Sequence, residues 1–201
     1  MFTKEDLRRL ILPLMVEQLL IVMVGMVDTI MISPCGEAAV SGISLVDSIN
    51  VLLTGMFSAL ATGGAVVAAQ YLGHKEGDRA CRAADQLLLS VLAVSGILVV
   101  VSLIGNYGIL RIIYRKIDAD VMGNARIYFY LSAVSYPFLA VYSAGTALFR
   151  AMGDSKISMK TSIVMNAINI AGNAVLLYIF ELGVFGAALA TLVSRIVAAV
   201  V

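Results

Sequence analysis

The sequence predicts an all-α integral membrane protein, built as a bundle of six transmembrane helices. Three observations lead to this fold class. Of the 201 residues, 61% are hydrophobic and only 13% are charged, which is more apolar than a soluble domain needs. The apolar residues form long continuous runs, whereas the strands of a membrane β-barrel would alternate over about ten residues. Small residues are frequent in the runs, as in "SALATGGAVVAAQ", and they let helices approach closely in a bilayer.

Six segments have the roughly 20 mostly apolar residues that a spanning helix needs. They cover residues 10–33, 44–70, 84–108, 124–149, 161–180 and 184–201. The first follows Lys4, Arg8 and Arg9 but also two acids, and no small-residue cleavage site comes after it. We therefore interpret it as a spanning helix and not as a removed signal peptide. The sixth runs to Val201 without a polar stop, so we expect the chain to be cut within this helix.

The distribution of Lys and Arg predicts that the N-terminus is cytoplasmic. In that orientation the inner segments hold nine basic residues and the outer segments four. The break "RIIYRKIDADVMG" is unusually basic for an outer loop. Cys35 and Cys81 fall on opposite sides of the membrane, so they cannot pair within one chain. We expect the cytoplasmic membrane as the location, with the lipid bilayer as surrounding partner.

The first segment carries two acids that share a face. Glu17 and Asp28 are eleven positions apart, which leaves them about 20° apart around a helix. Asp28 lies near the helix C-terminus, where the macrodipole disfavours a carboxylate. This position favours a functional role for Asp28 over an interfacial acid, while Glu17 could serve a cavity or packing equally. Pro13 could bend the helix or be a harmless early proline.

Polar stripes at helical spacing mark three further segments. They comprise Asp47, Asn50, Thr54, Ser58 and Thr62 in the second, Tyr128, Ser132, Ser135, Tyr142 and Thr146 in the fourth, and Ser162, Asn166, Asn169 and Asn173 in the fifth. A single stripe could serve only hydrogen bonds between helices. Several stripes with a buried acid indicate a shared aqueous cavity. We expect its lining to include Glu17, Asp47, Asn50, Thr54, Ser135, Tyr142 and Asn166. Arg195, in the sixth segment, either pairs with an acid or faces the rest of the protein.

The sequence contains no pattern typical of an enzyme. It has no glycine-rich phosphate loop, no spacing of metal ligands and no histidine that could serve an intramembrane nucleophile. We therefore expect no enzyme activity and no cofactor, and an ion gradient as the energy source. The net charge of +1 gives no reason to expect a nucleic-acid partner.

Several stretches resemble the multidrug and toxic compound extrusion (MATE) family. They are "VGMVDTIMIS", "GEAAVSGISLVDSINVL", "AAQYLGHKEGDRA", "YPFLAVYSAGTALFRAMGDSK" and "NIAGNAVLLYIFELGVFGAALATLVSR". The resemblance implies one lobe of a two-lobe, twelve-helix transporter, here the amino-terminal lobe over residues 1–201, with the carboxy-terminal lobe absent. It also implies export of organic cations and other amphiphilic drugs, by alternating access, in exchange for H⁺ or Na⁺.

The resemblance carries over to individual residues. Asp28 matches the family's first-helix acid and Pro13 its upstream proline, which implies a hinge. Tyr128, the pair Asn169 and Asn173, and Thr191 match further site residues of the family. Asp28 would then be the coupling acid. Ionised, it could bind Na⁺ together with oxygens of Asn169, Asn173 and Thr191, all hard donors. Alternatively it carries a proton, because desolvation favours the neutral form of a carboxylic acid.

Two other functions compete with this interpretation. One is a flippase for lipid-linked sugars from the same superfamily, whose cavity should hold several basic residues for a pyrophosphate. The mid-membrane charges here are three acids and only Arg195, which favours a cationic substrate. The other is a non-transporting six-helix membrane scaffold, which would not need an acid at the unfavourable end of a helix dipole.

Overall fold

The computed structural model describes residues 4–201, so the first three residues of the predicted lobe lie outside it. The described chain forms six α-helices and one 3₁₀ turn. They are α1 (Lys4–Ile32), η1 (Ser33–Cys35), α2 (Glu37–Gly73), α3 (Gly77–Ile113), α4 (Ala119–Ala151), α5 (Ser155–Tyr178) and α6 (Gly183–Val200). All six helices contain a stretch long and apolar enough to cross a membrane. The prediction of an all-helical bundle with six spans is therefore confirmed.

Several helices are longer than the apolar segments from which they were predicted. The second and third segments were expected over residues 44–70 and 84–108, but α2 and α3 each contain 37 residues. Hydropathy marks the part of a helix that suits hydrocarbon, whereas backbone hydrogen bonding continues into polar flanking residues. The connections between helices are correspondingly short.

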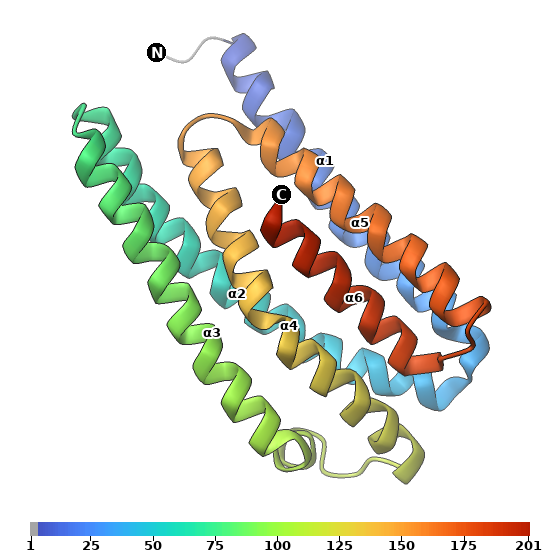
Figure 1. The fold of residues 1–201 in the computed structure, drawn as a ribbon. Coiled ribbons are helices and arrows are strands. Elements are labelled where there is room, and N and C mark those ends of the chain that lie inside the picture. Colours follow the sequence, from blue (N-terminus) through green and yellow to red (C-terminus); the bar gives the residue numbers. More distant parts are fainter. Residues whose placement is uncertain (1–3) are drawn as a thin grey trace.

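Helix α4 lies at the centre of the bundle. It packs against α2, α3, α5 and α6, while α1 packs mainly against α5 and α3 lies at the edge beside α2 and α4 (Figure 1). The buried side of α4 consists largely of small residues, with Phe129, Tyr136 and Leu139 filling the gaps between them. A helix with neighbours on several sides needs this composition, because small side chains let all of them approach.

Glycine makes the closest helix contacts possible. A Cβ added at Gly42 of α2 would lie 2.9 Å from the backbone nitrogen of Ala125 in α4. A Cβ at Gly172 of α5 would lie 3.0 Å from the Cβ of Ala190 in α6. The first contact is with backbone, which cannot rotate away, so α2 and α4 require glycine at this crossing.

The connections between helices divide the bundle into two ends (Figure 1). The α2–α3 and α4–α5 connections lie at one end, and η1 with the α3–α4 and α5–α6 connections lies at the other. Cys81 belongs to the first end and Cys35 to the second, and both are exposed free thiols. At the first end, Gly153 adopts a positive φ of 87°. The Asp154 side chain there accepts a hydrogen bond from the backbone N–H of Lys156 and caps α5.

Candidate functional site

Asp28 begins a hydrogen-bonded chain that crosses three helices. Its Oδ1 accepts a hydrogen bond from Nδ2 of Asn173 in α5, at 2.6 Å. The same Nδ2 donates to Oδ1 of Asn169 at 3.3 Å, one turn earlier. Asn169 in turn donates through Nδ2 to Oγ1 of Thr191 in α6, at 3.2 Å. The structure thus brings together the four residues expected to hold a coupling cation.

A second polar group, formed by α2 and α4, lies beside this chain. Nδ2 of Asn50 is 3.3 Å from Oδ1 of Asp47 and 3.4 Å from the Ser132 hydroxyl oxygen. The Tyr136 hydroxyl donates to Oδ1 of Asn50 at 3.1 Å. Tyr128 of α4 is buried near Asp47 and Thr191, between the two groups. We call the whole arrangement the polar network.

Arg195 of α6 supplies the positive charge of the polar network. Its Nη1 donates to the Ser135 hydroxyl oxygen at 2.6 Å. The guanidinium also interacts electrostatically with Asp28 and Asp47. Its hydrogen bond is to a serine and not to an acid, so the two alternatives left open for this residue stay open. Two carboxylates and one guanidinium give the network a formal charge of −1 when both acids are ionised.

The polar network is buried at its base and partly open at its charged groups. Asn50, Tyr128, Asn169 and Asn173 are at least 95% buried, whereas Asp28, Asp47, Thr191 and Arg195 are partly exposed. Oδ1 of Asn173 is buried and has no hydrogen-bond partner in the described structure. That oxygen, with the Asp28 carboxylate, is a hard donor suited to Na⁺. Within residues 4–201, no group of three or more His, Cys, Asp or Glu side chains forms a metal cluster.

The remaining predicted residues lie outside the polar network. Glu17 faces α5 like Asp28, and its Oε2 accepts a hydrogen bond from the Ser158 hydroxyl at 2.8 Å. Asn166 is buried on α5 with Nδ2 unpartnered. Tyr142 lines a pocket of about 240 Å³ at the Cys81 end of the bundle, together with Ser158. Thr54 is exposed on α2 and donates only to the Asn50 carbonyl, at 2.7 Å.

Pro13 lies well inside α1, because the helix begins at Lys4. An early-helix proline is harmless only within the first turn, so the harmless alternative does not hold. A proline at this depth removes one backbone hydrogen bond of the helix. Its side chain is buried. The position is compatible with a bend point, and the hinge role stays a prediction.

Three contributors to the polar network were not among the predicted site residues: Ser132, Tyr136 and Arg195, whose role the sequence left open. Ser132 belongs to the polar stripe of the fourth segment, and Tyr136 follows it by four positions. Helical spacing therefore places Tyr136 on the same face, and this signal could have identified it.

A family model described as MatE matches residues 13–175. The chain belongs to the MatE family. Among curated relatives, the uncharacterized transporter YisQ of Bacillus subtilis is 27% identical over 190 residues, which is 92% of this chain and 41% of that protein. The multidrug export protein MepA of Staphylococcus saprophyticus is 25% identical, with the same coverage of both chains. The probable multidrug resistance protein YoeA of B. subtilis is 32% identical over 80% of this chain and 35% of its own length.

Solved MATE transporters share the fold of this MatE chain. A crystal structure of MATE in the bent conformation gives a TM-score of 0.90 at 20% identity, over 98% of this chain and 44% of that one. An outward-facing multidrug resistance MATE transporter gives 0.90 at 21% identity, over 98% and 43%. The chain thus spans about two fifths of the relatives that it matches. Its fold is that of one multi-pass membrane lobe of such a transporter.

Proposed function

We propose that this lobe belongs to a secondary active antiporter that exports organic cations, drugs among them, in exchange for H⁺ or Na⁺. The polar network carries the proposal. It presents two carboxyl groups and one guanidinium, all partly exposed, with a formal charge of −1 when both acids are ionised. One added cation neutralises this charge, so an organic cation and a coupling ion would compete for the network. The names of MepA and YoeA, which refer to multidrug export and resistance, support this substrate class.

Asp28 is the coupling carboxylate in this proposal. In its ionised form it accepts the hydrogen bond from Asn173 Nδ2. Na⁺ would be bound by oxygens of Asp28, Asn169, Asn173 and Thr191, of which Oδ1 of Asn173 has no partner in the described structure. A proton on Asp28 would neutralise the same charge. In either case, loading the ion weakens the attraction of the network for a cationic drug.

The proposal includes a second lobe and an orientation. Alternating access needs two lobes that move against each other, and this chain spans 41% of the relatives YisQ and MepA. The partners are therefore a carboxy-terminal lobe, cationic amphiphilic small molecules and the lipid bilayer. The excess of Lys and Arg at the N-terminal end supports the cytoplasmic membrane with a cytoplasmic N-terminus.

The test measures efflux of a cationic dye from proteoliposomes that contain the two-lobe transporter, in which this lobe is joined to the proposed carboxy-terminal lobe. A pH gradient and a Na⁺ gradient are imposed separately on the wild type and on Asp28→Asn. We expect one gradient to drive efflux in the wild type and neither to do so in Asp28→Asn, because the amide cannot exchange a proton or supply charge. Asp85→Asn, at an exposed acid of α3 outside the network, is the matched control and should export normally.

Each rival function predicts a different result. A folded Asp28→Asn protein that exports like the wild type would show that coupling lies elsewhere. A flippase would move a lipid-linked pyrophosphate and not the dye. A scaffold would move neither the dye nor the lipid-linked pyrophosphate under either gradient. We also expect the lobe alone to transport neither compound, because alternating access needs a facing lobe.

A further inference from the structure

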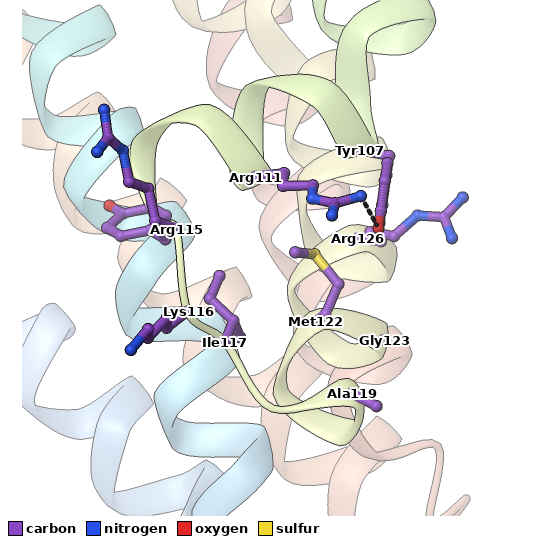
Figure 2. Close-up of a pocket in the computed structure, with 10 residues that line it drawn as sticks. Tyr107, Arg111, Arg115, Lys116, Ile117, Ala119, Met122, Gly123 and Arg126 are labelled. Carbon is purple, nitrogen blue, oxygen red and sulfur yellow. Dashed lines mark hydrogen bonds between the residues drawn. The ribbon is translucent and has the colours of Figure 1, made fainter.

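A strongly basic pocket lies where α3 meets α4, at the Cys35 end of the bundle and on different residues from the polar network. Its volume is about 440 Å³, and four cationic side chains line it: Arg111, Arg115, Lys116 and Arg126. In Figure 2, Arg111 reaches Tyr107 at one side of the pocket with Arg126 near the same ring. Arg115 and Lys116 extend from the loop at the other side.

Tyr107 contacts two of the guanidinium groups that line the pocket. The guanidinium carbons of Arg111 and Arg126 each lie 5.7 Å from the centre of its ring. Nη1 of Arg111 also donates to the Tyr107 hydroxyl oxygen at 3.1 Å. Contacts with an aromatic face orient the cations but leave most of their N–H donors free. Arg111 and Arg126 lie on opposite sides of this ring in Figure 2, and both line the pocket.

No carboxylate in the described structure neutralises these cations through an ion pair. Among the side chains that the structure describes, the only ion pair joins Arg79 and Glu76, at the other end of the bundle. Asp118 and Asp120 are nearby in the chain, but both are exposed and neither lines the pocket. The pocket therefore keeps an excess of positive charge.

The start of α4 adds to this positive potential. Ala119, Met122 and Gly123, from its first two turns, line the pocket. The side chain of the preceding Asp118 makes no capping hydrogen bond, so backbone N–H groups of the first turn remain available. The N-terminal end of a helix of 33 residues also carries a partial positive charge. The first turn of α4 and the four basic side chains thus favour the same kind of ligand, an anion with several acceptor oxygens.

The position of the pocket favours a lipid over a free anion. Helix α3 lies at the edge of the bundle, and Ile104 and Ile112 on it are 84% and 78% exposed. Such aliphatic side chains on a spanning helix face acyl chains. Tyr107 and Arg111 lie near them on the same helix, and aromatic and basic residues are enriched where a spanning helix meets headgroups. A lipid could therefore place its headgroup in the pocket and its chains along α3.

We propose that this pocket binds the phosphate group of an anionic phospholipid, of the phosphatidylglycerol type. Arginine donates paired hydrogen bonds to phosphate oxygens, and Lys116 adds a point charge. In the orientation given under the proposed function, the pocket lies at the outer surface, where basic residues are ordinarily scarce. A bound anionic lipid explains why four of them gather there.

The test uses native mass spectrometry of the purified protein in detergent. Phosphatidylglycerol and phosphatidylcholine with identical acyl chains are added in equal amounts, and inorganic phosphate is added in a separate arm. We expect the wild type to retain phosphatidylglycerol in preference, and Arg111→Gln with Arg126→Gln to lower this preference roughly thirtyfold, because each of the two cations contributes on the order of 1 kcal/mol near an anionic lipid. Arg79→Gln with Arg82→Gln, at the opposite end, should retain the full preference.

A second variant covers the case in which the first does not fold. Arg115→Gln with Lys116→Gln changes two exposed loop side chains and should also reduce the preference, by several fold. Equal retention of the two lipids by the wild type would overturn the proposal, as would variants that keep the preference. Displacement of phosphatidylglycerol by millimolar inorganic phosphate would identify a free-anion site instead. Because binding is measured without transport, these outcomes are independent of the antiport experiment.

Discussion

At the scale of single residues, Asn173 holds the polar network together. Its Nδ2 donates both to Asp28 and to Asn169, so it joins the acid on α1 to the amide and hydroxyl on α5 and α6. A carboxylate without such a donor would be left partly desolvated with fewer hydrogen bonds. Asn173 therefore links the stability of the lobe to its proposed ion site.

Replacing Asn173 by alanine should destabilise the lobe more than the same change at Asn166. Both side chains are about 95% buried or more on α5, but Nδ2 of Asn166 has no partner whereas Nδ2 of Asn173 has two. We expect Asn173→Ala to lower the free energy of unfolding by about 1–3 kcal/mol, and Asn166→Ala by about 1 kcal/mol less. Unfolding in mixed detergent, followed by circular dichroism, measures the difference. Equal losses would show that the hydrogen bonds to Asp28 and Asn169 contribute nothing.

The sequence could predict several site residues but not all of their partners. Glu17 and Asp28 both face α5, as their spacing indicated. The polar residues of the α2 stripe do not all lie on the buried face of the helix. Asn50 is buried, whereas Thr54 is exposed, because the stripe follows the edge of that face. The contact of Arg195 with Ser135 depends on how α6 packs against α4, which no local pattern in the sequence encodes.

At the scale of elements, the crossing of α2 and α4 depends on Gly42. Gly42→Ala should be destabilising by about 1–3 kcal/mol, since its Cβ would press on the backbone nitrogen of Ala125 at 2.9 Å. Gly63→Ala, in the same helix with nothing within 4 Å, should be neutral or stabilising by up to about 1 kcal/mol. Thermal unfolding of both variants in detergent checks the opposite signs. A stable Gly42→Ala protein would mean that the helices can separate at little cost.

Helix number was predictable and helix arrangement was not. Each spanning helix corresponds to one continuous apolar run in the sequence, so six runs predicted six helices. The extents differ because polar end residues such as Glu37 and Asp78 remain helical outside the apolar part. The central place of α4 follows from contacts with four other helices, and its small residues indicate this only once the neighbours are known. Packing partners are long-range properties that run lengths do not contain.

At the scale of the whole molecule, two native thiols report how the lobe lies in the membrane. Cys35 and Cys81 are both exposed and lie at opposite ends of the bundle. Helix α2 alone separates them by about 55 Å at 1.5 Å per residue, which exceeds the thickness of a bilayer. A reagent that cannot cross the membrane therefore reaches only one of them from each side.

With a cytoplasmic N-terminus, Cys35 should react with a membrane-impermeant maleimide in intact cells, and Cys81 only after permeabilisation. The physical reason is the retention of Lys and Arg in the cytoplasm, which places the nine basic residues with Cys81 and the four with Cys35. Cys35→Ser and Cys81→Ser assign each signal to one thiol. The reverse pattern would place the basic pocket at Tyr107 in the inner leaflet, where its four cations would need no special partner. Labelling from outside at Cys35 alone would place this excess of positive charge at the outer headgroups, where the proposed anionic lipid would balance it.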